Sequence, residues 1–262
     1  MIVRILFIGD IVGKPGRDLV RRGLAGIVDF HRIDFVIANA ENSAAGFGIT
    51  REIGDQLLDW GVDVMTSGNH IWDKKEALDY IGAEPRLLRP ANYPAGAPGN
   101  GTYLARTRDG RTVGVVNAMG RVFMLNIDDP FQVLLREIDA LKPRTRIVFV
   151  DFHAEATSEK IAMGWYLDGR VSAVVGTHTH VPTADNRVLP GGTAYCSDVG
   201  MVGPRDGVIG MERDPVLKRF LTGVPQKWRI ADGAVTFNSV LITIDRLSGR
   251  AVSIQRIDQV HE

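Results

Sequence analysis

The sequence predicts an α/β fold, a layered α/β/β/α sandwich in which two mixed sheets pack together and helices flank them. Strand-like apolar runs alternate with helix-like stretches, which favours parallel strands joined by right-handed crossovers. Hairpin patterns in the middle and near the end of the chain add antiparallel strands, so the sheets are expected to be mixed. With 262 residues, 45% of them hydrophobic, the chain is long enough to bury a large core. We therefore expect residues 1–262 to form a single domain.

The first third of the chain has the pattern of three strand and helix pairs. The apolar runs "VRILFIG", "DFVIANA" and "VDVMTSG" are each followed by a stretch with apolar residues near helical spacing. Asp73, with Glu76 three residues later, resembles a capping box that opens the third helix. The expected strands cover 3–9, 34–40 and 62–68, and the expected helices cover 14–30, 51–61 and 74–81.

The rest of the chain mixes hairpins with further strand and helix pairs. Residues 101–120 predict a hairpin around Asp109-Gly110, and Asp129 with Pro130 is typical of the start of a helix. Antiparallel strands are expected over 227–257, around Asp232-Gly233 and Ser248-Gly249. Between these segments we expect a strand over 146–153, a helix over 158–169 and a strand over 171–178.

Charge and cysteine content narrow the functional class. The 31 basic and 31 acidic residues cancel, so the chain lacks the overall positive charge that long nucleic acids attract, whereas a small anionic ligand remains compatible. Cys196 is the only cysteine, so no intramolecular disulfide forms, and we expect it to be a small core residue in a cytoplasmic protein. The apolar run in "MIVRILFIGD" is too short to cross a bilayer and has no cleavage signal, so no membrane association is expected.

Residues that bind metals or transfer protons follow each predicted buried strand. In open α/β sheets, ligands gather outside the carboxyl ends of the strands. Four of the six histidines are at these ends, together with two carboxylates and two asparagines. The residues are Asp10, Glu41, Asn42, Asn69, His70, His153, His178 and His180.

Each of these residues also has a structural interpretation. Asp10 is compatible with a helix cap, the asparagines with turns, and His153 with a hydrogen-bonded core histidine. The pair His178 and His180 is more specific, because extended backbone has a side-chain period of two and places both imidazoles on one side. Since so many polar side chains at one sheet edge need a cation to balance them, the whole set favours a metal site.

Several motifs resemble known families. "FIGD", "GNH" at 68–70 and "GTHTH" at 176–180 are similar to the motifs of calcineurin-like metallophosphoesterases, whose sites hold two metal ions. More closely, "ENSAAGFG", "TSGNHIWD", "DFHAEATSEK" and "GTHTHVPTAD" resemble the YmdB-like branch of bacterial metallophosphoesterases. Members of that branch act as 2',3'-cyclic nucleotide phosphodiesterases. The resemblance implies a metallophosphoesterase-like sandwich and a hydrolase that acts on small cyclic nucleotides, with 2',3'-cyclic AMP as the implied substrate.

The resemblance also implies a role for each site residue. Glu41 would bridge the two ions, and His70 would be the catalytic proton donor. The usual Asp-x-His of the superfamily is here Asp10-Ile11-Val12, so Asn42 would replace that histidine. The first metal would be bound by Asp10, Asn42 and His180, and the second by Asn69, His153 and His178.

A dinuclear mechanism follows from these ligands. Two divalent ions bring four positive charges against two carboxylates, so the site favours a phosphate and a metal-bridging hydroxide that attacks it. His70 would protonate the departing alkoxide, although a supporting hydrogen-bonding role is the rival interpretation. Nitrogen and oxygen ligands without thiolate suit iron or manganese, and zinc is compatible.

Other interpretations stay open at this point. The glycines of the loop 42–52 favour a simple turn of the chain over a wall of the substrate site. Glu155 either orients a ligand histidine or faces solvent at the start of a helix. The alternative functions are a phosphomonoesterase, a nuclease acting on RNA ends, and a regulatory protein with a structural metal site. A homo-oligomer is also left open.

Overall fold

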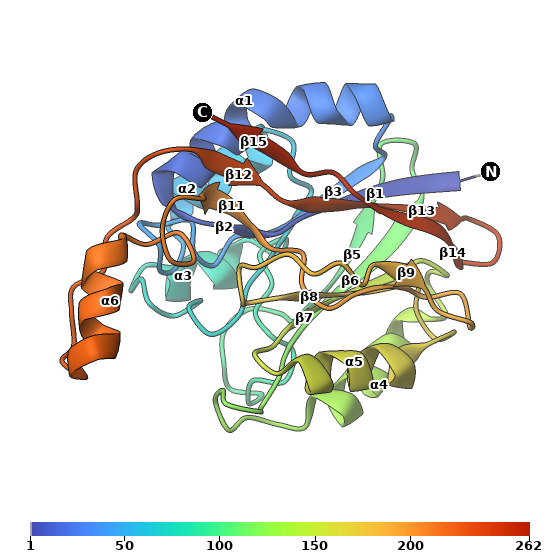
Figure 1. Ribbon diagram of the computed structural model, residues 1–262. Helices are drawn as coiled ribbons and strands as arrows, with labels where there is room; N and C mark the ends of the chain where they lie inside the picture. Colours follow the sequence, from blue (N-terminus) through green and yellow to red (C-terminus); the bar gives the residue numbers. More distant parts are fainter. Residues whose placement is uncertain (1) are drawn as a thin grey trace.

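Two mixed sheets dominate the computed structural model, which describes residues 2–262 (Figure 1). The first sheet has the strand order β14 (Ala251–Arg256), β13 (Ser239–Asp245), β1 (Ile2–Ile8), β3 (Phe35–Asn39) and β4 (Val64–Thr66). The second has the order β5 (Thr102–Arg106), β6 (Thr112–Met119), β7 (Val148–His153), β8 (Ala173–Thr177), β10 (Ala194–Cys196) and β9 (Arg187–Val188). In the first sheet the parallel strands β1, β3 and β4 form one side and the antiparallel strands β13 and β14 the other. In the second, the parallel strands β6, β7, β8 and β10 lie between the antiparallel edge strands β5 and β9, and both sheets are mixed, as the alternation and the hairpins predicted.

Helices cover the outer faces of the two sheets. In Figure 1, α1 lies on one side of the sheets, and α4 and α5 lie on the other. The first sheet is covered by α1 (Gly13–His31), α2 (Arg51–Asp59) and α3 (Ala77–Ala83), and the second by α4 (Pro130–Leu141) and α5 (Thr157–Leu167). The predicted α/β/β/α sandwich is confirmed. A sixth helix, α6 (Arg213–Thr222), stands out at one side (Figure 1).

Strand periodicity divides the core into three layers. Ile5 and Phe7 of β1 point into the layer between the sheets, where Phe7 stacks on Phe149 of the second sheet at 5.3 Å between ring centroids. Leu6 and Ile8 point to the opposite face and pack against α1 and α2. Since successive side chains of a strand point to opposite faces, one short apolar run contributes to both layers. Each such side chain stabilises the fold by roughly 1.5–3 kcal/mol through burial.

A third, smaller sheet lies beside the other two and was not predicted. Its strands are β15 (Gln259–His261), β12 (Val235–Phe237), β11 (Met201–Pro204) and β2 (Asp10–Ile11). Asp10 pairs in register with Met201, which joins the end of the first strand to a segment almost 200 residues later. This sheet therefore fixes the backbone of one of the predicted metal ligands.

Two local predictions were wrong. The third helix begins at Ala77, without a side-chain cap, because Asp73 hydrogen-bonds to His70 in the preceding turns. The hairpin around Asp232-Gly233 does not form, since β12 pairs with β11 and β15 and not with residues 227–231. The hairpins of β5 with β6 and of β13 with β14 are confirmed, and so is the cap of α4, where Asp129 accepts from Phe131 N at 2.9 Å.

No helix among residues 2–262 is both long and apolar enough to cross a membrane. Cys196 is fully buried on β10, as predicted, and burial raises the pKa of its thiol to about 11.

Candidate metal centre

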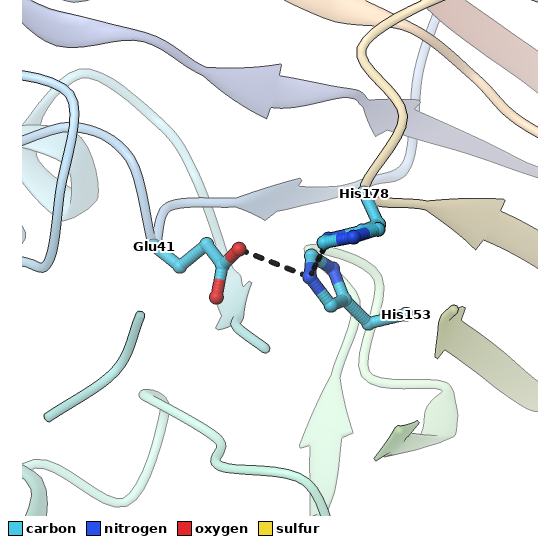
Figure 2. Close-up of side chains that lie close together, drawn as sticks. All are labelled: Glu41, His153 and His178. Atoms are coloured by element: carbon cyan, nitrogen blue, oxygen red, sulfur yellow. Dashed lines mark hydrogen bonds and ion pairs between the residues drawn. The ribbon is translucent and has the colours of Figure 1, made fainter. Parts of the chain in front are cut away.

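The predicted site residues meet where the strands of both large sheets end. His153 is the last residue of β7, His178 directly follows β8, and Glu41 comes two residues after β3. Figure 2 shows these three side chains pointing toward one another from separate segments. They form a group of potential ligand atoms that all lie within 4.8 Å of one another.

One imidazole nitrogen lies at the centre of this group. His153 is fully buried, and three potential ligand atoms surround its Nε2. Each is 3.0 Å away: Glu41 Oε1, Asn69 Oδ1 and His178 Nδ1. Ligand atoms about 2.1 Å from a cation and at right angles to each other are about 3.0 Å apart. The spacing is therefore that of atoms around a metal ion.

Hydrogen bonds on the far side of His153 fix its tautomer. The hydroxyl of Thr177 donates to Asp151 Oδ1 at 2.8 Å, so it accepts from His153 Nδ1, 2.9 Å away. The proton of the neutral ring is therefore on Nδ1, and the lone pair of Nε2 faces the group. Asn39, the last residue of β3, also donates to Asp151, at 3.3 Å.

His178 is oriented in the same way. Its Nε2 lies 3.0 Å from a carboxylate oxygen of Glu155, an ion-pair contact that favours the tautomer with the proton on Nε2 and the lone pair of Nδ1 facing His153. Burial and the neighbouring His153 lower the pKa of His178 to about 3, so the ring is neutral at pH 7. Of the two interpretations of Glu155, the geometry favours the one in which it orients a ligand histidine.

These atoms need a positive charge among them. Glu41 Oε1 is buried and has no aligned hydrogen-bond donor among the described residues, although His153 Nε2 is near. Glu41 and Asp10 raise the pKa of His153 in spite of its burial, and the charge of His153 keeps the pKa of Glu41 low. A proton on His153 Nε2 can form a hydrogen bond to only one acceptor at a time, whereas a cation can be bound by all four atoms together. The residues therefore fit a metal ion.

A second group lies beside the first. Asn42 Nδ2 is 3.3 Å from Asp10 Oδ1 and 3.1 Å from His180 Nε2. His180 Nδ1 donates to the carbonyl of Ile209 at 2.9 Å, so its Nε2 lone pair faces Asn42. Without a metal, the amide of Asn42 donates to both neighbours. If Asn42 binds a metal through its side-chain oxygen, its amide group has to flip so that the oxygen and the nitrogen exchange positions.

The two groups share contacts. Asp10 is fully buried, which raises the pKa of its carboxyl, and its Oδ2 accepts from the backbone N of His178 at 3.2 Å. The structure thus brings together all seven predicted ligands in two adjoining sets. The first set is Asp10, Asn42 and His180, and the second is Asn69, His153 and His178 with Glu41.

The reason given for the histidine pair was wrong, although both imidazoles face the same pocket. β8 ends at Thr177, and His178 and His180 have φ values of 103° and 64°, far from extended backbone. A buried ion pair fixes this turn. Asp198 accepts from Thr179 N at 3.1 Å and from Lys160 Nζ at 2.7 Å.

His70 borders the metal-binding groups without belonging to them. Its backbone N donates to Glu41 Oε2 at 2.9 Å, and its ring, 29% exposed, lines a pocket. Nδ1 lies 2.8 Å from Asp73 Oδ2, which fixes that nitrogen as the donor and leaves Nε2 for a ligand. The sequence analysis missed this contact of Asp73 with a candidate proton donor, because Asp73 was interpreted as a helix cap.

A pocket of about 260 Å³ opens beside the site. Four of the ligand candidates line it, together with His70 and five apolar or aromatic residues. The candidates are Glu41, Asn42, His178 and His180, and the apolar or aromatic residues are Gly46, Phe47, Ile209, Met211 and Trp228. The loop 42–52 therefore borders the pocket, contrary to the interpretation that the glycines favoured. No sequence signal pointed to Trp228, which lies in the segment wrongly assigned to a hairpin. A cavity of about 610 Å³ lies elsewhere and contains no ligand candidate.

Comparisons with known proteins agree with this geometry. A profile of the YmdB-like protein family matches residues 6–257. The chain belongs to the YmdB-like family. The matched range includes every ligand candidate from Asp10 to His180.

Curated and solved YmdB-like relatives cover nearly the whole chain. A protein of Bacillus subtilis named 2',3'-cyclic-nucleotide 2'-phosphodiesterase is 51% identical, over 97% of this chain and 96% of its own. A putative phosphatase/phosphodiesterase of Mycoplasma genitalium is 35% identical, over 97% and 92%. Among solved structures, a hypothetical protein from Thermus thermophilus is 44% identical with a TM-score of 0.93, over 99% and 100% of the chains. A Mycoplasma pneumoniae phosphatase is 33% identical with a TM-score of 0.93, over 99% and 94%.

Proposed function

We propose that this YmdB-like protein is a metal-dependent phosphoric diester hydrolase that opens 2',3'-cyclic nucleotides, 2',3'-cyclic AMP among them. The observation that carries the proposal is the set of four potential ligand atoms formed by His153 Nε2 and the three atoms 3.0 Å from it, which a cation would balance together. The activity named for the Bacillus subtilis relative, at 51% identity over the whole domain, supports the substrate class. The 2' ester in that name leads us to expect a 3'-phosphate as the product.

Two metal ions are proposed, one in each set of ligands. Asp10, Asn42 and His180 would hold one ion, and Asn69, His153 and His178 the other, with Glu41 between them. When bound, such a pair supplies a nucleophile from water at neutral pH and neutralises the charge of the phosphoryl group. Iron or manganese suits this mixture of nitrogen and oxygen ligands, and zinc is compatible with it.

His70 is the proposed proton donor. Hydrolysis forms a bond from a water oxygen to phosphorus and breaks the bond from phosphorus to O2', so the departing O2' needs a proton. Asp73 holds Nδ1 of His70 and directs Nε2 toward the pocket that also contains Glu41 and His178. Asp73 acts on the reaction only through His70 and is therefore a positioning residue.

The pocket favours a small substrate. Its volume of about 260 Å³ is near the lower end of small-molecule sites, and the net charge of the chain is zero. A long nucleic acid would need a basic surface that the overall charge does not provide. A phosphomonoesterase activity is the second candidate, because relatives from both Mycoplasma species carry the word phosphatase in their names.

Metal content and substrate range test the proposal together. The protein is purified, its bound metals are measured by mass spectrometry, and turnover is compared for 2',3'-cyclic AMP, 3',5'-cyclic AMP and 3'-AMP. We expect close to two metal ions per chain and fastest turnover of 2',3'-cyclic AMP, with 3'-AMP as product. Stoichiometric metal without turnover would instead favour the regulatory protein, and fastest release of phosphate from 3'-AMP would favour the phosphomonoesterase.

A further inference from the structure

The pocket has an apolar wall that hydrolysis of the phosphodiester does not use. Phe47 and Trp228 line the same cavity as His70 and His178, together with Ile209 and Met211. The ring centroids of Phe47 and Trp228 are 6.3 Å apart, with 36° between the ring planes. The lining of the pocket therefore combines polar ligand candidates with a pair of neighbouring aromatic rings.

The two aromatic rings come from distant segments that other contacts hold in place. Phe47 lies in the loop after β3, and its ring also meets the edge of His70 at 5.0 Å between centroids. Trp228 follows α6, and the guanidinium of Arg219 on α6 lies 5.2 Å from its ring. Gly46 has φ near 92°, and a Cβ there would come within 2.7 Å of Met211 Cε, so the loop packs closely on this wall.

A short backbone ladder fixes the segment that carries Trp228. Glu212 N donates to Arg229 O at 2.9 Å, and Ala231 N donates to Gly210 O at 2.9 Å. Met211 and Ile230 form an antiparallel bridge between these two bonds. The backbone on the carboxyl side of Trp228 is thus tied to the segment that supplies Ile209 and Met211 to the pocket.

We propose that Phe47 and Trp228 bind the nucleobase of the substrate by stacking, while the metal-binding groups hold its cyclic phosphate. This inference rests on the proposed function and names the part of the substrate that the apolar wall recognises. A cyclic nucleotide has a phosphate at one end and a flat base at the other, and the lining of the pocket offers both polar ligand candidates and aromatic rings. Aromatic rings stack on any base, because every base has a π-face.

The kind of recognition follows from the residues of the wall. Phe47, Ile209 and Met211 offer no side-chain hydrogen-bond donor to read the edge of a base. The single donor of the wall, Nε1 of Trp228, is buried without a partner among the described residues, so we expect most of the recognition to come from stacking area. Purines have the larger area, and we expect them to be preferred to pyrimidines by several-fold and not by the large factors that edge recognition gives.

The test compares a nucleotide with the same substrate lacking its base. Values of kcat/KM are measured for 2',3'-cyclic AMP and for ribose 2,3-cyclic phosphate, in the parent and in Trp228→Ala. The ratio of the two values is expected to fall about tenfold in the variant, mainly through a higher KM for the nucleotide. Trp228→Phe should restore most of the ratio, because it keeps an aromatic face. Phe47 is left unchanged, because it also touches His70.

Trp165→Ala is the matched control. Trp165 is half-exposed on α5, and the guanidinium of Arg187 lies 5.7 Å from its ring. This contact resembles that of Arg219 with Trp228, but Trp165 does not line the pocket. Its substitution should leave the ratio unchanged. Thermal unfolding of both variants checks that the fold is kept.

An unchanged ratio in a folded Trp228→Ala would overturn the inference, whether neither substrate or both substrates equally lose turnover. A binding measurement separates this inference from the proposed function. If the parent hydrolyses neither cyclic substrate, the proposed function fails, and calorimetry with 3'-AMP and ribose 3-phosphate then decides the inference alone. Stacking predicts that the parent binds 3'-AMP about tenfold more tightly than the base-free phosphate, and that Trp228→Ala removes this difference.

Discussion

At the scale of single residues, the site depends on which nitrogen of each histidine is free. On the side away from the cluster, Thr177 accepts a hydrogen bond from His153 Nδ1 and Glu155 lies 3.0 Å from His178 Nε2, which favours lone pairs directed inward on both rings. Loss of such a partner typically weakens metal binding 10 to 100-fold. The residues around the ligands therefore matter almost as much as the ligands.

His70→Ala should keep its metal and lose turnover. General acid catalysis contributes typically 10² to 10⁴-fold, so kcat for 2',3'-cyclic AMP should fall by about that factor. A p-nitrophenyl diester, whose leaving group needs little proton help, should show a smaller loss. Parental turnover of the cyclic nucleotide by this variant would show that the donor is another residue.

Gly68→Ala should damage the metal site through sterics alone. A Cβ at Gly68 would lie 2.1 Å from Cδ2 of the His153 ring, so the ring has to move. We expect metal content to fall below two ions per chain. The value of kcat/KM should fall about 100-fold, because a displacement of about 1 Å at a reacting group can reduce the rate by that factor. Gly26→Ala on α1 is the control, because nothing lies within 4 Å of its Cβ and it should bind metal normally. Full metal content in Gly68→Ala would contradict the close packing.

At the scale of elements, helix α5 positions the turn that holds two ligand histidines. Lys160 of α5 is 2% exposed and pairs with Asp198, which in turn accepts from Thr179 N between His178 and His180. On the same helix, Glu159 accepts from Arg121 N and fixes the turn after β6. Both side chains point inward from a helix that is otherwise half-exposed.

Lys160→Ala should destabilise the fold. Removing one partner of a buried ion pair leaves the other charge unpaired and costs about 3–5 kcal/mol. Urea unfolding measures this loss. Lys142→Ala is the control, because its ion pair with Asp139 has the same length of 2.7 Å but is exposed, and its loss should cost less than about 1 kcal/mol. Equal effects of the two substitutions would contradict the role of burial.

At the scale of the whole molecule, the metal-binding groups connect three sheets. Asp10 lies on the small sheet, Glu41 follows a strand of the first large sheet, and His153 ends a strand of the second. A cation bound among them would add a further link between layers that already meet through apolar packing and through buried hydrogen bonds such as that from Asn39 to Asp151. Binding to the native state alone therefore stabilises the complete fold.

Metal removal should lower the melting temperature. At a free metal concentration 100 times its Kd, binding contributes about 2.7 kcal/mol, which is a shift of several degrees for a chain of this size. Thermal melts with a chelator and with added Mn²⁺ measure the shift. Glu41→Ala should lose both the metal-dependent shift and turnover, because Glu41 contacts the second group of ligands and the backbone of His70. An equal shift in that variant would exclude Glu41 as a ligand.

The sequence alone determined the alternation of strands and helices, the mixed sheets and the eight residues at the strand ends. It did so because strand periodicity and the rule that ligands gather at carboxyl ends of parallel strands are local or nearly local properties. Only the tertiary structure decided that Asp73 pairs with His70 instead of capping α3, and that Trp228 lines the pocket. It also decided the third sheet and the positive φ of His178 and His180. These features depend on contacts between segments far apart in the chain, whose energy outweighs the local preference for a cap, a hairpin or an extended strand.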